Sequence, residues 1–587
     1  MPGPTPPLAS VLVANRGEIA WRVFRACREL GIRTIGVYSE ADRGAPWLAA
    51  ADDAFLLGPA APADSYLHVA RVLDVARRAD AAAVHPGYGF LSENADFART
   101  VTDAGLVWVG PPPAAITAMG DKLSARTTAM AAGVPVVPGT VEPTDDPDEV
   151  AAFTDAHGYP IAIKAAFGGG GRGLRVVRSA DQLAGALEAA RREAVASFGR
   201  GEVYVERYLA RPRHIEAQVL ADTHGACLFL GERDCSTQRR HQKLIEEAPA
   251  PGLDPDVRAG LGAAAVAVSR QVGYAGAGTV EFLVTDDQFH FLEMNTRLQV
   301  EHPVTELVTG IDLVHWQLRI AAGEALPWTD DDIVTRGHAI EVRVNAERPA
   351  ADFTPAAGRI TRWDPPAGPG VRVDAGVVAG WEVPTTYDSL LAKLICWGAD
   401  REHARRVLSR AVDEFAVAGV PTTLPFHRYA LAHPDMVEGR MSTVSVEHDW
   451  DLSALPPDAD TTPAEGPATP SRTYTVEVDG RALQVAVFDP DDADRQAGRR
   501  SRRRGTAASA GADDGRVVAP MQGTVVKVAA SVGDTVAAGD VIVVLEAMKM
   551  ENHVTAPRDG VVSRMLAEPG AVVQQGEGLF IIDAPDA

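Results

Sequence analysis

The sequence is poor in cysteine, in net positive charge and in long apolar runs, and each shortage excludes a class of protein. Four cysteines in 587 residues are too few for a disulfide framework, and their spacing is not that of a metal site. We therefore expect a reducing compartment, the cytoplasm. The formal net charge of −23 argues against non-specific binding to nucleic acid. No run of about 18 apolar residues occurs and residues 1–10 lack signal-peptide features, so neither a membrane span nor secretion is expected.

The length and composition are those of a soluble protein with several domains. A chain of 587 residues is too long for one hydrophobic core and predicts three or four domains. The apolar fraction of 46% and the charged fraction of 23% are ordinary for a globular protein.

Near the C-terminus a short unit occurs twice, with one lysine between the copies. Ala519-Pro520 recurs 37 residues later as Ala556-Pro557, and several glycines and valines recur at the same offset. Because glycines mark turns between strands, the repeat predicts a small pseudo-symmetric β-barrel. Lys549, within Glu546-Ala547-Met548-Lys549-Met550-Glu551, is then expected on an exposed hairpin tip. An ordinary surface lysine is the alternative.

The N-terminal third has the pattern of a parallel α/β domain. A short apolar run at 10–14 precedes an amphipathic segment to about Leu30, and a second apolar run follows Gly31. Strand, helix, strand is a βαβ unit. Its loop contains one glycine and is a weak dinucleotide signal. A third strand at 81–85 opens into the loop 86–94, which is either a ligand-binding loop or a tight turn.

A glycine run follows a predicted strand at 160–165. Gly168-Gly169-Gly170-Gly171 lets the backbone approach a ligand and direct several N–H groups at phosphates. Lys122 and Lys164 add positive charge at its edges. No GK[ST] opens a helix here, so this is not a Walker P-loop. A flexible hairpin is the alternative.

Two glutamates are predicted to face each other across a hairpin. If 286–288 form its loop, Thr285 pairs with Phe289 and Glu281 lies opposite Glu293. Opposed carboxylates repel each other, and a divalent cation reverses the sign of that interaction. Oxygen ligands of this kind suit Mg²⁺. The alternative is a bulge that displaces the pair and leaves each glutamate solvated.

Polar residues continue at every second position after Glu293. Asn295, Arg297, Gln299 and Glu301 share one parity, and mostly apolar residues occupy the other. A period of two predicts a strand with one apolar face and one face of carboxylates, amides and a guanidinium. A solvated edge strand also alternates, and is the alternative.

These segments resemble biotin-dependent carboxylases. AMKM at 547–550 is similar to the biotin attachment motif of biotinyl domains. ERDCSTQRRHQK at 232–243, EMNTRLQVEH at 293–302 and EVRVNAE at 341–347 resemble biotin carboxylase. The likeness runs in the family's order from about Leu8 to Asp449. One departure is Phe167, where many members have glycine or serine.

The resemblance implies an α/β fold class and a domain order. It predicts a biotin carboxylase with a pre-ATP-grasp α/β domain at 8–120, an ATP-grasp domain at 121–330 and a C-terminal mixed domain at 331–449. A flexible linker at 450–515, with a hairpin at 472–488, then precedes a small all-β biotinyl barrel at 516–584.

The resemblance also implies a set of site residues. ATP is expected to contact Lys122, Lys164, Gly168, Gly169, Gly170, Gly171, Glu206, Leu209, His214, Gln238 and His241. Mg²⁺, with Mn²⁺ as an alternative, is expected on Glu281, Glu293 and Asn295, and bicarbonate on Arg297, Gln299 and Val300. The expected catalytic residues are Glu301 as the base, Lys243 on the transferring phosphate, Arg343 on the biotin oxygen, and Arg297. Biotin is expected to be covalently attached to Lys549.

The implied activity is that of an ATP-dependent carbon–nitrogen ligase. ATP activates bicarbonate as carboxyphosphate, which delivers CO₂ to a ureido nitrogen of biotin. A separate carboxyltransferase β subunit is expected to transfer the carboxyl group to acetyl-CoA or propionyl-CoA, and a biotin protein ligase to load Lys549. Homo- or hetero-oligomers are expected. The alternatives are one chain of a split 2-oxoacid carboxylase, such as one for pyruvate, and a pure carrier with an inactive ATP-grasp scaffold. A lipoyl domain is disfavoured, because lipoylated lysines usually lie in a DKA-type context.

The linker composition does not support a buried core. It is rich in Pro, Ala, Asp and Thr and contains the basic run 499–504, which is either a docking or RNA-binding element or a solvated spacer. The segment 472–488 interrupts it with alternating residues around Asp479-Gly480, which is a strong hairpin signal. A flexible linker of this length reaches on the order of 40 Å and keeps the tethered group near roughly millimolar effective concentration.

Overall fold

The computed structural model describes most of the chain as two compact units. The described residues are 8–140, 144, 146–165, 175–198, 203–285, 288–456, 472–478, 481–487, 516–520, 523–547, 550–573 and 576–583. The first unit takes in the described residues of 8–353, 357–418 and 422–456, and the second takes in the other described residues. The predicted sites at Gly168–Gly171 and Lys549 lie outside the described residues.

The first unit begins with a five-stranded parallel sheet of order β3-β2-β1-β4-β5. Its elements are β1 (Ser10–Val13), α1 (Gly17–Glu29), β2 (Arg33–Ser39), β3 (Asp53–Gly58), α2 (Val69–Arg78), β4 (Ala83–His85), α3 (Ala95–Asp103), β5 (Val107–Trp108) and α4 (Pro113–Gly120). Gly31, with φ of 72°, ends the first helix as predicted. The loops after β1 and β4 meet, because the Asn15 amide donates to the carbonyls of Pro86 and Tyr88, at 2.7 Å each. The strand order changes direction between β1 and β4. In open α/β sheets, ligands bind at the point where the order reverses in this way.

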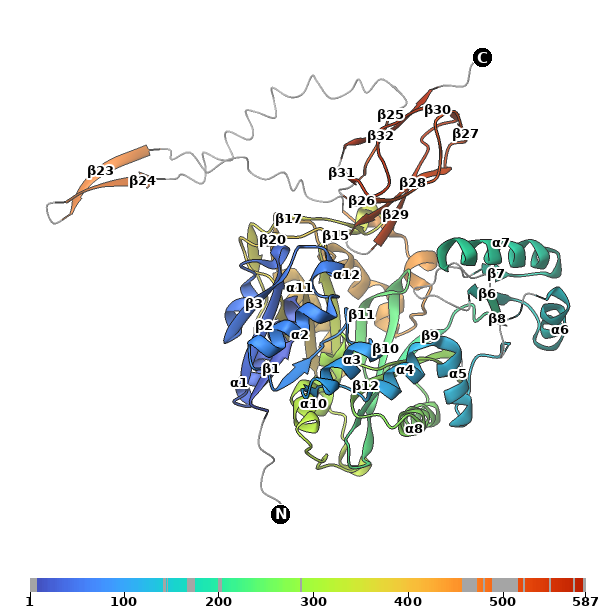
Figure 1. Ribbon diagram of the computed structural model, residues 1–587, viewed down its shortest axis with the longest axis horizontal. Coiled ribbons are helices and arrows are strands. Elements are labelled where there is room, and N and C mark those ends of the chain that lie inside the picture. Colours follow the sequence, from blue (N-terminus) through green and yellow to red (C-terminus); the bar gives the residue numbers. More distant parts are fainter. Residues whose placement is uncertain are drawn as a thin grey trace. The chain divides into compact units, whose positions relative to one another are not determined.

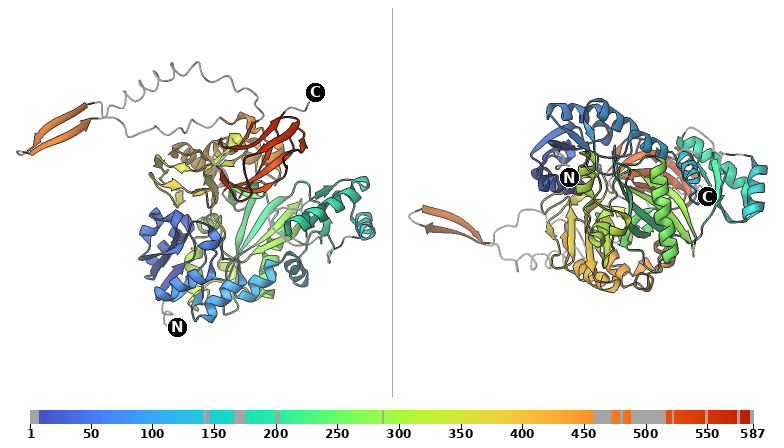
Figure 2. Two further views of the ribbon diagram at one scale, coloured as in Figure 1. Left: turned by 45° about the horizontal axis from the view of Figure 1, so that its top comes forward. Right: turned by 90° about the horizontal axis from the view of Figure 1, so that it is seen from below.

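A small layered subdomain follows. Strands β7 (Arg175–Val177), β6 (Ile161–Ala165) and β8 (Val203–Arg207) form a three-stranded sheet. Helices α6 (Pro147–His157) and α7 (Ala180–Phe198) cover it (Figure 2). Helix α5 (Lys122–Ala131) leads into this subdomain, with its amino end capped by the Asp121 side chain.

The central feature of the first unit is an eight-stranded sheet of order β13-β12-β9-β10-β11-β14-β21-β19. The strands are β9 (Arg213–Ala221), β10 (Cys227–Arg239), β11 (Gln242–Ala248), β12 (Gly276–Thr285), β13 (Gln288–Asn295), β14 (His338–Asn345), β19 (Val371–Ala375) and β21 (Leu390–Gly398). The sheet is continuous across the predicted domain boundary at residue 330, so the site residues on both sides of that boundary share one scaffold.

Helices cover both faces of this sheet. Helix α8 (Pro255–Gln271) packs on β9, β10 and β12 (Figure 1). Ile340, Val342 and Val344 of β14 pack with α11 (Arg401–Glu414) in one core. The intervening residues, Glu341 and Arg343, therefore point to the opposite face, toward α9 (His302–Thr309).

The remaining elements of the first unit are short or peripheral. They include α10 (Leu313–Ala321), α12 (Leu424–Ala432), α13 (Pro434–Glu438), and the strand pairs β17 (Gly358–Arg359) with β20 (Glu382–Val383) and β18 (Arg362–Asp364) with β22 (Ala416–Ala418). Among the residues that the structure describes, no helix is both long enough and apolar enough to cross a membrane.

The C-terminal domain confirms the predicted repeat. It contains two four-stranded sheets, of order β25-β32-β30-β27 and β29-β28-β26-β31. The strands are β25 (Arg516–Val518), β26 (Gly523–Val528), β27 (Thr535–Val536), β28 (Val541–Ala547), β29 (Met550–Thr555), β30 (Gly560–Met565), β31 (Val572–Val573) and β32 (Gly578–Asp583). Gly533 and Gly570, which are equivalent in the repeat, have φ of 97° and 85°. The two copies thus turn at the same positions, where glycine is required.

The linker contains the predicted hairpin. Strand β23 (Arg472–Val478) pairs with β24 (Arg481–Val487) in an antiparallel register that joins Val478 to Arg481. The two turn residues, Asp479 and Gly480, lie outside the described residues.

Candidate functional site

Four charged residues form a row across four neighbouring strands of the large sheet. Glu293 on β13 lies opposite Glu281 on β12, Glu281 lies opposite Glu216 on β9, and Glu216 lies opposite Arg233 on β10. Arg233 is fully buried and donates to both Glu216 Oε2, at 3.0 and 3.1 Å, and Gln299 Oε1, at 2.5 Å. The row therefore connects the predicted metal residues with the predicted bicarbonate residues.

The predicted opposition of Glu281 and Glu293 is confirmed, but the predicted hairpin loop is wrong. Thr285 pairs with Gln288, not with Phe289, so only residues 286 and 287 connect the strands. A register shift between Glu281 and Phe282 then inserts one extra residue on β13 and restores the opposition. The shorter loop and the extra residue on β13 offset each other, so the two carboxylates still face each other.

The electrostatics of this pair fit a divalent cation. Burial and the charge of Glu281 raise the pKa of Glu293. Burial opposes ionisation of Glu281 as well, but the Lys243 ammonium and His214 hold its pKa well below the usual value. The Asn295 amide donates to Glu281 Oε1 at 2.7 Å, so the third expected ligand lies beside the pair. Carboxylate and amide oxygens close together are the ligand set that Mg²⁺ prefers.

Lys243 and Arg343 both bind Glu301. Lys243 Nζ lies 2.7 Å from Glu301 Oε1 and 3.1 Å from Glu281 Oε1, and it also contacts Glu216. Arg343 donates to Glu301 Oε2 at 3.0 Å. Burial disfavours the Glu301 charge, yet these cations keep its pKa below the ordinary value. Glu301 is thus ionised at neutral pH, the state that a general base requires.

The strand predicted to run through Glu301 is shorter than expected. Strand β13 ends at Asn295, and Glu301 is the residue before helix α9. Arg297 donates to Glu93 Oε2 at 2.9 Å and to Asn295 Oδ1 at 2.7 Å. Gln299 donates to Glu281 Oε1 at 2.8 Å. Side-chain contacts, not a continuous strand, therefore bring these groups together.

The Val300 backbone is also anchored. Lys393 is fully buried on β21, and its Nζ donates to the Val300 carbonyl at 2.9 Å. The same ammonium lies 3.3 Å from Glu18 Oε2 in α1. Lys393 on β21 thus holds the bend between β13 and α9, and Glu18 in α1 in turn binds Lys393.

A narrow cavity lies on the predicted nucleotide side of the row. It is lined by Lys122, Leu123, Arg126, Val137, Lys164, Tyr204, Glu206, Phe291, Leu292 and Glu293. Within it, Lys164 forms an ion pair with Glu206. The cavity thus joins three predicted ATP residues to one predicted metal residue, and Leu209 is half-buried just beyond β8.

His214 links the nucleotide side to the metal side. Its Nε2 atom lies 2.9 Å from Glu281 Oε2, and Gln238 contacts its Nδ1 atom at 3.3 Å. Burial would lower its pKa, but the Glu281 carboxylate raises it. His241 lies in the turn after β10, where burial and the nearby Lys164, His214 and Lys122 lower its pKa, against the opposing effect of Glu447. His241 therefore lies within electrostatic range of Lys122, Lys164 and His214.

Sequence reasoning missed Glu216, Arg233 and Glu246. Glu246 accepts from Arg343 Nε at 2.6 Å, which makes it the second carboxylate on that arginine. A signal for Glu216 was available, because His214, Glu216 and Gln218 alternate with apolar residues along β9. Period-two polarity within a buried strand indicates a functional face. Its pairing with Arg233 was not readable, because it depends on the strand order.

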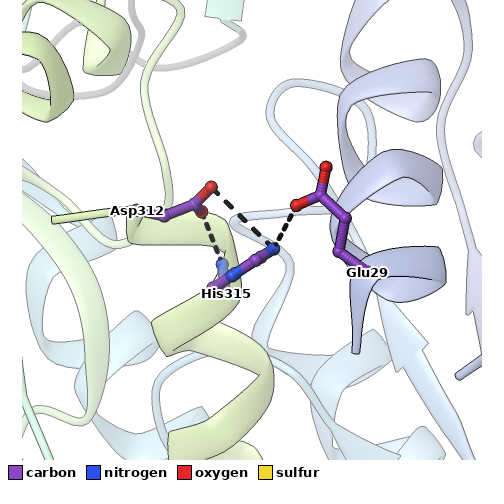
Figure 3. Close-up of side chains that lie close together, drawn as sticks. All are labelled: Glu29, Asp312 and His315. Atoms are coloured by element: carbon purple, nitrogen blue, oxygen red, sulfur yellow. Dashed lines mark hydrogen bonds and ion pairs between the residues drawn. The ribbon is translucent and has the colours of Figure 1, made fainter. Parts of the chain in front are cut away.

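A separate group with metal-binding side chains lies between α1 and α10. Figure 3 shows His315 between two carboxylates, with Nε2 at 2.8 Å from Glu29 Oε2 and 4.0 Å from Asp312 Oδ2. Arg22 already binds Asp312 at 2.7 Å, and the His315 amide donates to the same carboxylate. We interpret this group as an ion-pair cluster between the two helices.

Domain families match the chain in four consecutive segments. Residues 7–116 match "Biotin carboxylase, N-terminal domain", and residues 121–329 match "Carbamoyl-phosphate synthase L chain, ATP binding domain". Residues 341–448 match "Biotin carboxylase C-terminal domain", and residues 515–582 match "Biotin-requiring enzyme".

The similar proteins differ in how much of this chain they cover. The biotin-dependent acyl-coenzyme A carboxylase alpha3 subunit of Mycobacterium leprae is 49% identical over 93% of this chain and 94% of that protein. A pyruvate carboxylase subunit of Methanothermobacter thermautotrophicus is 51% identical over 75% of this chain and 89% of its own length. Among solved structures, the biotin carboxylase of Campylobacter jejuni in complex with an ATP analogue has a TM-score of 0.72 and 43% identity, covering 75% of this chain and 98% of its own.

Proposed function

We propose that this chain, which belongs to the biotin carboxylase family and carries its own biotin-requiring domain, delivers a carboxyl group to a separate carboxyltransferase β subunit that acts on acetyl-CoA or propionyl-CoA. The chain is an ATP-dependent biotin carboxylase, and biotin, ATP and Mg²⁺ are its cofactors and substrates. The similarity to an acyl-CoA carboxylase α subunit is the observation that supports an acyl-CoA as the acceptor, because it covers 93% of this chain and 94% of that protein.

Lys549 is proposed as the biotin attachment site. Biotin supplies a ureido nitrogen that accepts the carboxyl group and transports it between sites. The register of β28 and β29 supports this assignment, because Ala547 pairs with Met550 and only Met548 and Lys549 connect the two strands. We propose a biotin protein ligase, which would load Lys549, as a second partner.

Glu281, Glu293 and Asn295 are proposed to hold Mg²⁺, with the nucleotide beside them. Mg²⁺ supplies positive charge to the phosphates when it is bound. Lys164, Lys122 and the glycine run are proposed to cradle those phosphates. Two observations support these roles: the two carboxylates lie directly opposite each other in the sheet, and the cavity next to Glu293 is lined by both lysines.

The proposed carboxylation step uses the groups around Glu301. Arg297 and Gln299 orient bicarbonate, and Glu301 accepts its proton as a bicarbonate oxygen attacks the γ-phosphate of ATP. The bond to the β-phosphate breaks, ADP leaves, and carboxyphosphate, the donor of CO₂, is formed. Lys243 neutralises the transferring phosphoryl group. Arg343 would face the ureido oxygen of biotin and stabilise negative charge on that oxygen. The support is geometric, since Glu301 is shared between Lys243 and Arg343.

A split 2-oxoacid carboxylase is the second candidate. Its support is the 51% identity with a pyruvate carboxylase subunit, a match that covers 75% of this chain. The carrier-only alternative requires a disabled carboxylase. Against it, the charged groups of the site are all present: Glu281 lies opposite Glu293, Lys243 contacts Glu281, and Arg343 binds Glu301.

We place the protein in the cytoplasm, within a hetero-oligomer. Support for a reducing compartment comes from the four cysteines, each of which is buried and unpaired. The partner supplies the carboxyltransferase active site. The linker predicted at 450–515 is proposed to carry biotin between the two sites, although its first residues, 450–456, belong to the first unit.

A pull-down from the native cell tests the proposal. We expect a carboxyltransferase subunit to copurify, mass spectrometry to find biotin on Lys549, and the complex to incorporate labelled bicarbonate into acetyl-CoA or propionyl-CoA. Incorporation into pyruvate or 2-oxoglutarate alone would favour the second candidate. Absence of bicarbonate-dependent ATP hydrolysis with free biotin would support the carrier-only alternative.

A further inference from the structure

The turn between β10 and β11 uses residues that its backbone geometry disfavours. Arg239 pairs with Gln242, so Arg240 and His241 form a two-residue hairpin turn. Their φ angles are 46° and 64°. A turn with two left-handed residues suits Asn-Gly and strains residues with longer side chains. Arginine and histidine at these positions break a local rule, which is typical of a functional site.

A second left-handed pair holds this turn. Asp352 and Phe353 have φ of 59° and 56°. Asp352 binds both arginines of the turn region: Oδ2 accepts from Arg240 at 2.9 Å, and Oδ1 forms an ion pair with Arg239. The Arg239 guanidinium also stacks over the Phe353 ring at 5.1 Å. One carboxylate thus fixes two consecutive arginines from a segment more than 100 residues away in the chain.

The backbone of the turn has a further anchor, and its base is buried. The Arg240 amide donates to Glu447 Oε1 at 3.2 Å. Phe353 is 1% exposed and packs against Phe426 with a centroid separation of 5.2 Å. The side chain of Arg239 is 7% exposed, whereas those of Arg240 and Asp352 are 60% and 66% exposed. We call Arg239, Arg240 and Asp352 the clamp: its exposed carboxylate pairs with one buried and one exposed arginine, and Arg239 stacks on the buried Phe353.

The clamped hairpin carries groups of the nucleotide side. His241 shares its electrostatic surroundings with Lys122, Lys164 and His214. Gln238 pairs with Lys243 in the hairpin register and contacts His214 at 3.3 Å. A change in the turn would therefore move His241 directly, while Lys243 is held separately by three carboxylates.

We propose that Asp352 is a positioning residue for the nucleotide: by binding Arg239 and Arg240 it holds the strained turn in the conformation that presents His241, with Gln238, to ATP. The inference rests on the proposed assignment of these two residues to ATP. Asp352 contacts no substrate in this scheme. Its effect is confined to ATP, because bicarbonate and biotin are assigned to the Arg297–Glu301 segment and Arg343.

Asp352→Asn tests the clamp while keeping the backbone, because asparagine tolerates the left-handed region as well as aspartate does. In bicarbonate-dependent ATP hydrolysis with free biotin, we expect KM for ATP to rise about three- to fivefold, as for loss of an ion pair that is partly exposed. We expect kcat and the KM values for bicarbonate and biotin to stay at the wild-type level.

Two further variants separate this role from a structural one. Asp413→Asn removes the partner of Arg428, an exposed ion pair at 2.9 Å elsewhere in the unit, and is expected to leave all three KM values unchanged. The double variant Asp352→Asn/His241→Ala is expected to bind ATP no worse than His241→Ala alone, because Asp352 acts through His241.

Several outcomes would overturn the inference. One is a folded Asp352→Asn protein with wild-type KM for ATP; another is an equal rise in all three KM values, which would indicate a general structural effect. Additive losses in the double variant would do the same. The wild-type protein separates these outcomes from a failure of the proposed function: if it turns over ATP only when bicarbonate is present, the carboxylase assignment stands whatever Asp352 does.

Discussion

Replacing Glu293 with glutamine should separate metal binding from folding. Glu293 is half-buried opposite Glu281, and burial together with the Glu281 charge raises its pKa. In the metal-free protein this carboxylate is a source of repulsion, of about 0.2–1 kcal/mol for like charges across a ladder. Glu293→Gln is therefore expected to leave the metal-free melting temperature unchanged or to raise it slightly.

Metal-dependent turnover should respond in the opposite direction. A carboxylate bound to a dication is worth at least as much as a charge-assisted hydrogen bond, about 1.5–3 kcal/mol. Its loss corresponds to an increase of about 10- to 150-fold in the Mg²⁺ concentration needed for half-maximal ATP turnover. The assay is bicarbonate-dependent ATP hydrolysis with free biotin, titrated with Mg²⁺ at saturating ATP.

Glu281→Gln is the matched comparison, because its carboxylate has both a metal role and a structural role. It accepts from His214, Lys243, Asn295 and Gln299. An amide in its place directs hydrogens at some of these donors, so this variant should lose about 1–3 kcal/mol of unfolding free energy as well as metal affinity. Unchanged Mg²⁺ dependence in Glu293→Gln, or equal destabilisation of both variants, would refute the ligand assignment.

Three other perturbations give distinct results. Lys549→Ala should abolish carboxyl transfer to the acceptor but keep carboxylation of free biotin; loss of both activities in a folded protein would contradict a two-site arrangement. Arg233→Met removes the guanidinium that donates twice to Oε2 of the buried Glu216 and leaves Lys243 as the cationic partner of that carboxylate. It should cost about 3–5 kcal/mol in chemical denaturation, and a small loss would contradict the role of the row. Burial lowers the pKa of His85 and of His427 to about 4. From pH 6.5 down to 4 the unfolded state binds more protons at these two histidines than the native state does. The free energy of unfolding should therefore fall on acidification by about 3 kcal/mol per histidine. A melting temperature that stays constant over this pH range would be inconsistent with neutral buried imidazoles.

Local sequence patterns predicted much of the fold and part of the candidate site. The repeat around Lys549 predicted equivalent turns, and Gly533 and Gly570 adopt the same left-handed conformation. This worked because glycine spacing and strand alternation are short-range properties of a chain. The hairpin loop at 286–288 was wrong by one residue, because register depends on bulges that the sequence pattern does not mark.

The sequence by itself determined the identity of the chemical groups and their order along the chain. Spacing and resemblance named Glu281 and Glu293 as candidate metal ligands, Glu301 as the candidate base and Lys549 as the candidate attachment site. The sequence also determined that a biotin-bearing domain follows a carboxylase through a linker of low hydrophobicity, since composition alone decides whether a segment can bury a core.

Only the tertiary structure decided which groups act on one another. Glu216 and Arg233 join the site because β9 lies between β12 and β10, although β12 follows β10 by more than 35 residues in the chain. Arg343 and Lys243 converge on Glu301, and Asp352 reaches Arg240, through contacts between distant segments. Strand order and packing arise from the burial of whole faces, a property of the folded sheet that no local window contains.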